Sequence, residues 1–419
     1  MISVLVPHPS ILQGLPASLL PATYAPHDWS RFRRVRSALR LATMVAREGT
    51  SVTYRHKLTQ RGGAARRLEI GVWRALRGVG HDIEAVAARM DRRLPIDRWL
   101  AGLLVWTRPD LVLLPTMLHE DAYHNDVIRA ARLAGIPVLA APASWDTLTS
   151  KGGFLQRPDR LIVWGQQSAQ HAVAHHGFPM SAVQVTGPPH FAFHDPKFQR
   201  PACLEPFDIR TTLVRYAERL KGPRDQPLPI LVAGTSLNYW ADEHQMLADL
   251  GRALGTHQRV IYRPHPRGSW GWHLRDVMPP GVTLDPQVER AQGTERLGYS
   301  LDPADLAYYP LLLSSVQCVV AAFSTLVVEA AIQGRPSCLV GWGKSRHGDG
   351  GILVHSRYEH MQHVVEWPGV ALCSDLETLL RAIAFHADGI GLGLPERARE
   401  VAVTEQSWDR IEQAIHAAA

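Results

Sequence analysis

The chain has 419 residues, of which 46% are hydrophobic and 20% charged, and a formal net charge of +6 at pH 7. This composition is that of a globular protein and excludes disordered and fibrous classes, and the length exceeds one ordinary core, so we expect two domains. No apolar stretch reaches the ~18 residues that a membrane-spanning helix needs.

The first residues, MISVLVPHPSILQGLPASLLP, are apolar, but proline interrupts them and they have no charged leader. We therefore do not interpret them as a signal peptide, and we expect a cytoplasmic protein. Residues 28–103 hold 17 Lys and Arg against 7 Asp and Glu. This excess indicates either a solvated helical surface or a patch that contacts anionic lipid at the inner membrane face. We expect no nucleic-acid partner, because aromatic side chains do not interleave with the basic ones.

From residue 111 onward, short apolar runs alternate with helical patterns, and after a segment rich in proline and charge (188–227) the alternation restarts. Strands that are apolar on both faces and joined by helices are typical of parallel sheets. We predict an α/β fold with two doubly wound, Rossmann-like domains that face a cleft. The expected division is an acceptor-binding domain at 1–195, a linker at 196–227, a donor-binding domain at 228–400, and a C-terminal helix at 401–419 that packs back on the first domain.

Two polar loops follow strands of the first domain, where ligands of this fold class bind. In SWDTLTSKGG (144–153), Trp145 is a candidate wall for a sugar ring, Lys151 a candidate acceptor contact and Asp146 a candidate catalytic acid or base. In PTMLHEDAYHND (115–126), His119 and Asp121 are further candidates for the catalytic base. The competing interpretation of both loops is structural, with capped turns or helix starts.

Polar loops also follow three strands of the second domain. ILVAGTSLNYW (230–240) contains Gly234, Thr235 and Ser236, a turn of small residues that an anion can approach. VIYRPHPRG (260–268) places Arg263 and His265 at a strand end that prolines keep extended. A purely structural loop is the alternative in each case.

The third of these loops lies in VVAAFSTLVVEAAIQGRP (319–336), where a strand leads into a helix. Ser324 and Thr325 stand at the helix start, where free N–H groups favour phosphate. Glu329 follows Thr325 by four residues on the same helix face, so its carboxylate is a candidate for binding both hydroxyls of a ribose. A plain capped helix with a surface glutamate is the competing interpretation.

The order of SWDTLTSKGG, RPDRLIVWG, VQVTGPPHF, YRPHPRG and AAFSTLVVEAAIQGRP resembles bacterial GT-B-fold transferases. The sequence is similar to the CDP-glycerol glycerophosphotransferase and UDP-GlcNAc 2-epimerase-like groups over roughly residues 105–345. The resemblance implies that Ser324 and Thr325 hold the donor phosphates and Glu329 the ribose. It also implies that Arg263 and His265 meet the diphosphate. By the same resemblance, the backbone near Leu284 and Asp285 meets the base.

The resemblance implies a metal-independent glycosyltransferase that uses a nucleotide-sugar donor as co-substrate and no other cofactor. The expected acceptor is a cell-surface polysaccharide or a lipid-linked molecule. The alternatives are a CDP-glycerol-type polyol-phosphate transferase, a UDP-GlcNAc 2-epimerase-like enzyme and a non-catalytic nucleotide-binding scaffold. No histidine spacing reproduces a metalloprotease motif, so we expect no metal site. The four cysteines are scattered without a C-x-x-C pair and are expected to be small core residues.

Overall fold

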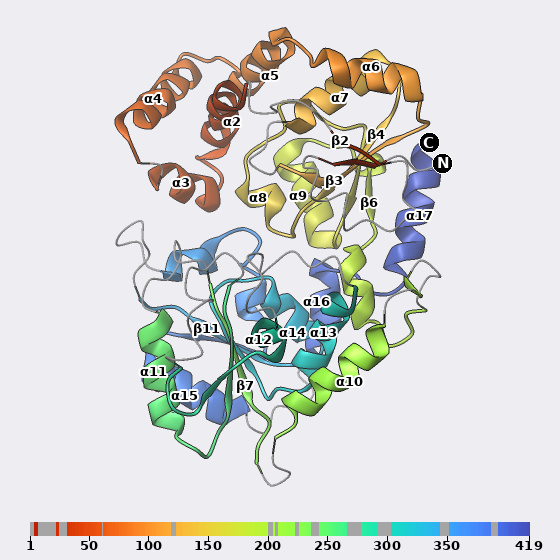
Figure 1. Ribbon diagram of the computed structural model, residues 1–419. Coiled ribbons are helices and arrows are strands. Elements are labelled where there is room, and N and C mark those ends of the chain that lie inside the picture. The colour runs from red at the N-terminus through yellow and green to blue at the C-terminus, as the bar shows by residue number, and fades with distance from the viewer. Residues whose placement is uncertain are drawn as a thin grey trace.

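The computed structural model describes most of the chain. The described residues are 4–6, 22–24, 32–60, 62–118, 123–199, 204–205, 208–222, 226–235, 243–265, 278–290, 303–343, 352–386 and 393–419. Within them the elements form an upper, N-terminal domain and a lower, C-terminal domain (Figure 1). A short parallel pair, β1 (Val4–Val6) and β2 (Ala22–Tyr24), precedes both.

Helices of the basic segment form a bundle at the outer side of the N-terminal domain (Figure 1). They are α2 (Arg33–Arg47), α3 (Val52–Thr59), α4 (Ala64–Gly78), α5 (Ile83–Arg93) and α6 (Arg98–Thr107). Leu39, Ala42 and Val45 recur at three-residue spacing along α2 and are buried, because this stripe faces the neighbouring helices. The bundle therefore has its own apolar core.

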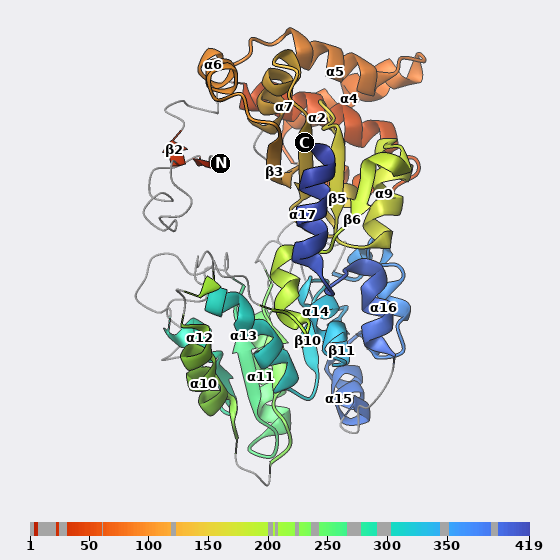
Figure 2. The ribbon, with the colours of Figure 1, turned by 90° about the vertical axis from the view of Figure 1, so that its right-hand side faces the viewer.

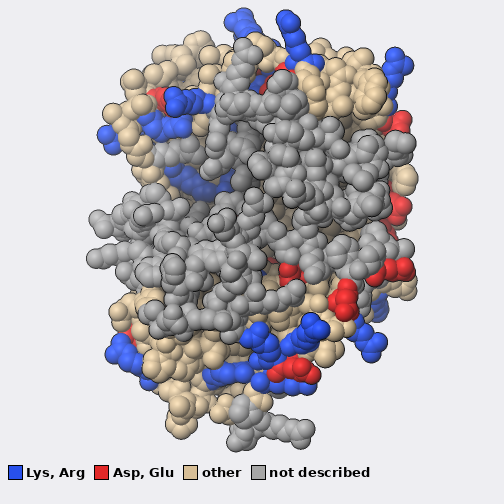
Figure 3. All heavy atoms as spheres, viewed as in Figure 1, with Lys and Arg blue, Asp and Glu red and all other residues tan. Residues whose placement is uncertain are grey.

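Several of the bundle's positively charged side chains form ion pairs with acidic side chains of the N-terminal domain. The guanidinium of Arg36 is 1% exposed and bonds to Asp91 at 2.8 Å and to Asp126 at 2.5 Å. Arg74 and Arg77 both pair with Glu48, at 2.7 Å and 3.0 Å. On the face shown in Figure 3, the described Lys and Arg side chains lie at both the upper and lower ends, with acidic side chains among them. Within the bundle, the positive charges of Arg36, Arg74 and Arg77 are therefore compensated by carboxylates.

The N-terminal domain is built on a four-stranded parallel sheet in the order β3-β4-β5-β6. Its strands are β3 (Val112–Met117), β4 (Val138–Pro142), β5 (Arg160–Val163) and β6 (Val183–Val185), with helices α7 (Tyr123–Leu133), α8 (Thr147–Ser150) and α9 (Gln166–His176) in the connections. Leu139, Leu161 and Val163 are almost fully buried, as expected for strands covered on both faces.

The C-terminal domain contains a six-stranded parallel sheet in the order β12-β11-β10-β7-β8-β9. The strands are β7 (Ile230–Ala233), β8 (Val260–Arg263), β9 (Val282–Leu284), β10 (Val319–Ala321), β11 (Ser337–Val340) and β12 (Val370–Cys373). Helices α11 (Glu243–Leu254), α12 (Pro286–Arg290), α13 (Pro303–Ser314), α14 (Leu326–Ile332) and α15 (Leu376–Phe385) flank this sheet. The strand order reverses between β7 and β10, which is where ligands bind in doubly wound sheets. The predicted fold class, two doubly wound α/β domains, is confirmed by the two parallel sheets.

The chain crosses between the domains twice. After β6 it passes through the 3-10 helix η3 (Pro189–His194) to α10 (Ile209–Leu220), and it returns through α16 (Leu394–Val401) and α17 (Ser407–Ala418). Figure 2 shows α17 beside the upper sheet, where Ala414 packs against Leu139 and Ile162. The segment between α16 and α17 runs so close to the loop after β6 that a Cβ at Gly187 would overlap the carbonyl oxygen of Val403.

Three cysteines, Cys318, Cys338 and Cys373, are buried free thiols in the core of the C-terminal domain, as the sequence predicts. Cys203 lies outside the described residues. None of the helices in the described part of the chain is long and apolar enough to cross a bilayer.

Candidate active site between the two domains

A cavity of about 380 Å³ opens between the carboxyl edges of the two sheets. Its lining residues from the N-terminal domain are Lys57, Trp145, Asp146 and Ser150. Those from the C-terminal domain are Ala233, Gly234, Thr235, Arg263, Pro264, His265, Tyr309, Ala322, Phe323, Ser324, Thr325, Leu326, Glu329, His355, Tyr358 and His360. The loops after β7 and β10 both contribute, so the cavity lies at the topological switch point of the second sheet.

The turn after β7 forms part of the cavity wall and is held from behind by a buried carboxylate. The backbone N–H of Thr235 donates to Glu243 Oε2 at 2.6 Å, and the Tyr262 hydroxyl donates to Oε1 at 2.5 Å. Burial raises the pKa of Glu243 to about 7, although these two hydrogen bonds oppose the rise. A Cβ at Gly234 would lie 2.8 Å from Glu243 Oε1 and 2.9 Å from the backbone nitrogen of His265, so glycine is needed here. Ser236 lies outside the described residues.

The loop after β10 supplies hydroxyl groups and one carboxylate. Ser324 Oγ accepts the backbone N–H of Leu326 at 3.1 Å, so Ser324 caps the first turn of α14. On the same helix, Glu329 Oε2 is 3.2 Å from His194 Nε2, and Gln333 donates to His194 Nδ1 at 3.0 Å. Because Nδ1 accepts that bond, Nε2 carries the proton and donates to Glu329. Glu329 Oε1 has no hydrogen-bond partner among the described residues and is available to a ligand.

Arg263 reaches the cavity but is already engaged by protein groups. Its terminal nitrogens bond to Asp285 Oδ2 at 3.0 Å, to Gln287 Oε1 at 2.6 Å and to the Tyr309 hydroxyl at 2.7 Å. Burial opposes the charged form, but Tyr309 and Asp285 hold the pKa of Arg263 above its ordinary value. The guanidinium therefore contributes a fixed positive charge at the cavity edge rather than a flexible clamp.

The side chain of Asp285 is engaged by protein groups. It is 0% exposed, it does not line the cavity, and besides Arg263 it accepts the N–H of Gln287 at 2.8 Å. Its side chain therefore holds Arg263, which lines the cavity, and the start of α12. Leu284 does not line the cavity either, and the predicted contact of this backbone with a base stays a prediction.

The opposite wall comes from the loop after β4, where Trp145 and Asp146 both line the cavity, as expected. Trp145 is only 3% exposed and packs edge-on against His360, with ring centroids 5.0 Å apart. The Ser150 hydroxyl donates to Asp146 Oδ2 at 2.7 Å. Burial opposes ionisation of Asp146, but His360, Lys57 and that hydrogen bond lower its pKa to about 2. Lys151 is not among the residues that line the cavity.

His360 brings an imidazole from the C-terminal domain to this wall. Its Nδ1 is 2.8 Å from Thr149 Oγ1, and that hydroxyl lies 3.1 Å from the carbonyl oxygen of Asp146 as a donor. In the tautomer in which the hydroxyl proton is directed to the carbonyl, Nδ1–H donates to Thr149 Oγ1 and Nε2 carries the lone pair. Burial lowers the pKa of His360 to about 4, so the ring is neutral at pH 7.

Helix α3 of the bundle bridges the two domains beside this wall. The carboxylate of Glu359 accepts the N–H of Val52 at 2.7 Å and also the hydroxyl of Thr53. One turn later, His56 Nδ1 is 2.6 Å from the Tyr358 hydroxyl. Lys57 donates to the carbonyl of Ser150 at 2.9 Å and lines the cavity. The bundle therefore forms part of the site rather than a separate appendage.

The structure gathers most of the candidate residues in one place. The candidates that line the cavity are Trp145, Asp146, Gly234, Thr235, Arg263, His265, Ser324, Thr325 and Glu329. His119 and Asp121 lie outside the described residues. Sequence reasoning missed Lys57, Tyr309, His355, Tyr358 and His360. The signal for the last three was the density of polar rings in VHSRYEH (354–360), because no strand that the structure describes ends directly before this segment. No cluster suited to a metal ion occurs in the part of the chain that the structure describes.

No protein family matches the sequence, and no curated relative matches it. Among solved structures, the chain is similar to a UDP-GlcNAc 2-epimerase from Methanocaldococcus jannaschii, with 13% identity and a TM-score of 0.48 over 76% of this chain and 80% of that one. It is similar to a putative UDP-N-acetylglucosamine 2-epimerase from Listeria monocytogenes, with 15% identity and a TM-score of 0.45 over 81% and 80%. A glycosyltransferase from Rickettsia africae shows 12% identity and a TM-score of 0.41 over 76% and 79%.

Proposed function

We propose that the protein is a glycosyltransferase that moves a sugar from a nucleotide-sugar donor to an acceptor hydroxyl. The observation that carries this proposal is the composition of the cavity. Its C-terminal wall offers groups that bind an anion, and its N-terminal wall offers a neutral imidazole beside an ionised carboxylate. A cavity with those two walls suits a reaction that joins a phosphorylated donor to a neutral nucleophile.

On the donor side, the nucleotide diphosphate would contact the Gly234–Thr235 turn and the hydroxyls of Ser324 and Thr325. The ribose hydroxyls would donate hydrogen bonds to Glu329 Oε1, which the His194 contact leaves available. His265 would donate to the departing diphosphate, with the fixed charge of Arg263 nearby. These roles are supported by the position of each side chain on the cavity wall.

On the acceptor side, His360 is a better general base than Asp146. A carboxylate with a pKa of about 2 binds protons weakly, whereas the neutral Nε2 of His360 carries a free lone pair. The acceptor hydroxyl would give its proton to Nε2 while its oxygen attacks the anomeric carbon. The bond from that carbon to the diphosphate oxygen breaks, and the electron pair leaves with the diphosphate. Asp146 would stabilise the imidazolium that forms.

The acceptor that we propose is a cell-surface polysaccharide or a lipid-linked molecule, and the bundle would contact anionic lipid at the inner membrane face. Binding of the protein to vesicles that contain phosphatidylglycerol at low salt tests the second part. The charge of residues 28–103 supports membrane contact, but the internal pairing of Arg36, Arg74 and Arg77 reduces the charge available for it. Equal binding to neutral and anionic vesicles would refute the lipid contact.

Epimerisation of a nucleotide sugar is the second candidate, because an imidazole beside a carboxylate also suits removal of a proton from a sugar carbon. Titration with UDP, CDP and GDP, followed by turnover of the matching nucleotide sugars in D₂O, distinguishes the two. Transfer requires an acceptor and leaves the sugar protons unchanged, whereas epimerisation needs no acceptor and introduces deuterium. Replacement His360→Ala should abolish either reaction with nucleotide binding retained, and His363→Ala, on the exposed side of the same segment, is the matched control. Full activity of His360→Ala would remove this residue from the mechanism.

A further inference from the structure

The carboxylate of Glu329, which would contact the ribose of the donor, is held by a histidine that no ligand in the cavity can touch. Glu329 Oε2 is 3.2 Å from Nε2 of His194, and Nδ1 of the same ring is 3.0 Å from the amide nitrogen of Gln333. Glu329 lines the cavity and keeps 10% of its side-chain surface accessible. The side chain of His194 is only 1% accessible and does not line the cavity. His194 can therefore act on a ligand only through Glu329.

The imidazole of His194 separates two side chains that would otherwise meet. Gln333, at the C-terminal end of α14, follows Glu329 by four residues, and side chains at this spacing are neighbours on a helix surface. Without the ring, the Gln333 amide N–H would donate to the carboxylate and draw it along the helix. With the ring in place, Gln333 donates to Nδ1 and Nε2–H donates to Oε2. Oε1 of Glu329 is thereby left to a ligand.

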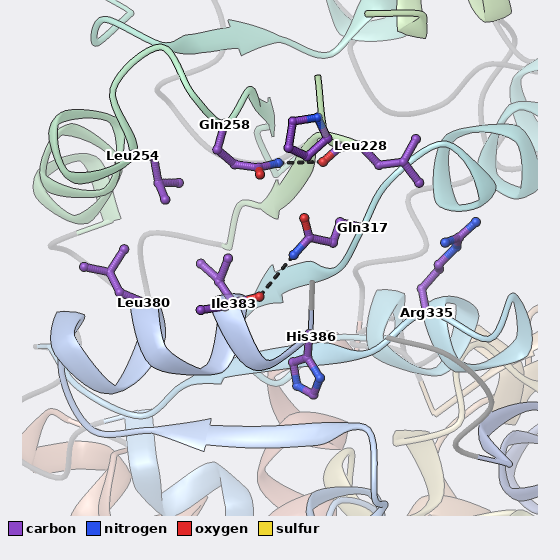
Figure 4. Close-up of a pocket in the computed structure, with 10 residues that line it drawn as sticks. Leu228, Leu254, Gln258, Gln317, Arg335, Leu380, Ile383 and His386 are labelled. Atoms are coloured by element: carbon purple, nitrogen blue, oxygen red, sulfur yellow. Dashed lines mark hydrogen bonds between the residues drawn. The ribbon is translucent and has the colours of Figure 1, made fainter. Parts of the chain in front are cut away.

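The backbone that carries Glu329 is fixed at the far end of α14. The Arg335 guanidinium, just after this helix, donates to the carbonyl oxygen of Ser314 at 2.6 Å. Figure 4 shows Arg335 at a second cavity, which it lines together with Gln317, a residue just before β10. The helix therefore ends at the edge of the sheet away from the candidate active site. Because this end is anchored, loss of His194 should redirect the Glu329 side chain rather than displace α14.

The ring of His194 is itself positioned from outside the C-terminal sheet. His194 is the last residue of η3, and its ring packs against Phe191 with centroids 5.3 Å apart. Phe191 is fully buried and packs in turn against Trp164, which directly follows β5, at 5.1 Å. The indole N–H of Trp408 in α17 donates to the carbonyl oxygen of Pro189 at 2.7 Å. These contacts tie η3 to the N-terminal domain and to α17, so the ring is a fixed support for a side chain of the other domain.

We propose, resting on the Glu329–ribose contact of the proposed function, that His194 is a positioning residue that directs Glu329 Oε1 to the ribose and so makes the site prefer ribonucleotides to 2′-deoxyribonucleotides. An Oε1 that faces the cavity can accept both ribose hydroxyls, and a 2′-deoxynucleotide has lost one of them. Hydrogen bonds to a charged acceptor are stronger than those between neutral groups, so the missing hydroxyl weakens binding measurably.

The experiment measures, by calorimetry on the full chain, the affinities for UDP, CDP and GDP and for the 2′-deoxy form of each. The wild-type protein should bind its preferred ribonucleotide about ten- to a hundredfold more tightly than the 2′-deoxy form. His194→Phe keeps a ring against Phe191 but removes both hydrogen bonds, so the ratio should fall about tenfold, mainly through weaker binding of the ribonucleotide. His194→Gln can place an amide N–H near the position of Nε2 and should restore most of the ratio. His194→Leu makes the same test if His194→Phe fails to fold.

Two further variants distinguish failure of this role from failure of the proposed function. Glu329→Ala should abolish the ribose preference; if it does not, or if the wild-type protein shows none, the ribose contact itself is wrong and the role of His194 falls with it. A preference lost in Glu329→Ala but kept in His194→Phe would overturn the role of His194 alone. Equal weakening of both nucleotide forms in His194→Phe would overturn it too. His190→Phe is the matched control on η3, because its ring packs against Trp164 at 5.4 Å, and it should keep the wild-type ratio.

Discussion

Replacement of Glu243 by glutamine should make the folded protein more stable at alkaline pH. Glu243 is 4% exposed behind the Gly234–Thr235 turn, and its pKa in the folded protein is about 7 against an ordinary value of 4.5. Between these two values the folded state holds a proton that the unfolded state has released. Stability therefore falls as the pH rises from about 4.5 to about 7, and the loss is complete above pH 7.

The magnitude follows from the size of the shift. A rise from 4.5 to about 7, at 1.36 kcal/mol for each pKa unit, corresponds to about 3 kcal/mol. Glutamine retains an oxygen that accepts the Thr235 N–H and never ionises, so the variant should not lose this stability. Below pH 4.5 the two proteins should differ little, because both carry a neutral side chain at this position.

Urea unfolding of both proteins at several pH values between 4.5 and 8 measures the effect. The difference in the free energy of unfolding should grow by about 3 kcal/mol across the range, and other titrating groups cancel in that difference. Tyr262→Phe is the companion variant: its loss of the hydroxyl hydrogen bond should raise the pKa of Glu243 further and move the transition to higher pH. A difference that stays constant with pH would refute the reasoning.

Three further changes test the site and the domain connection. Glu359→Ala should release α3 from the C-terminal domain, so that hydrogen exchange in α3 becomes faster and turnover falls while nucleotide affinity stays unchanged. Glu359→Gln, the control, should retain part of the contact. Equal hydrogen exchange in the wild-type protein and both variants would contradict this. Gly187→Ala should lower the free energy of unfolding in urea by roughly 3 kcal/mol, because the φ of Gly187 is +79° and the added Cβ would overlap Val403. Gly80→Ala, with φ +86° and open space around it, should lower the free energy of unfolding by about 1 kcal/mol from backbone strain alone. Equal losses in the two variants would be inconsistent with the overlap. Asp146→Asn should lower the free energy of unfolding by about 2 kcal/mol at pH 7 and leave it unchanged near pH 2. The lowered pKa of Asp146 stabilises the folded protein at pH values above the ordinary pKa of 3.8, and this contribution disappears as the pH falls through about 2. A loss of stability that does not depend on pH would exclude this carboxylate as its source.

The sequence by itself determined the strands, the parallel sheets and the loops that carry most of the site. Apolar runs of four to six residues, such as 230–233 and 318–323, predict buried strands because a strand covered on both faces needs apolar side chains throughout. In a doubly wound sheet the polar residues after such strands gather at one edge. This reasoning was sufficient to place Thr235, His265 and Ser324 on a common cavity wall.

Only the tertiary structure decided which partners these side chains meet. The sequence predicts that Arg263 binds phosphate. In the folded C-terminal domain its guanidinium forms hydrogen bonds with Asp285 and Tyr309. His360 and Lys57 are 303 positions apart and follow no strand, and they enter the site because α3 packs against the 352–360 segment. Local sequence patterns reflect neighbours along a helix or strand. Contacts across the domain boundary depend instead on how the two domains dock, and no periodicity in the sequence records that geometry.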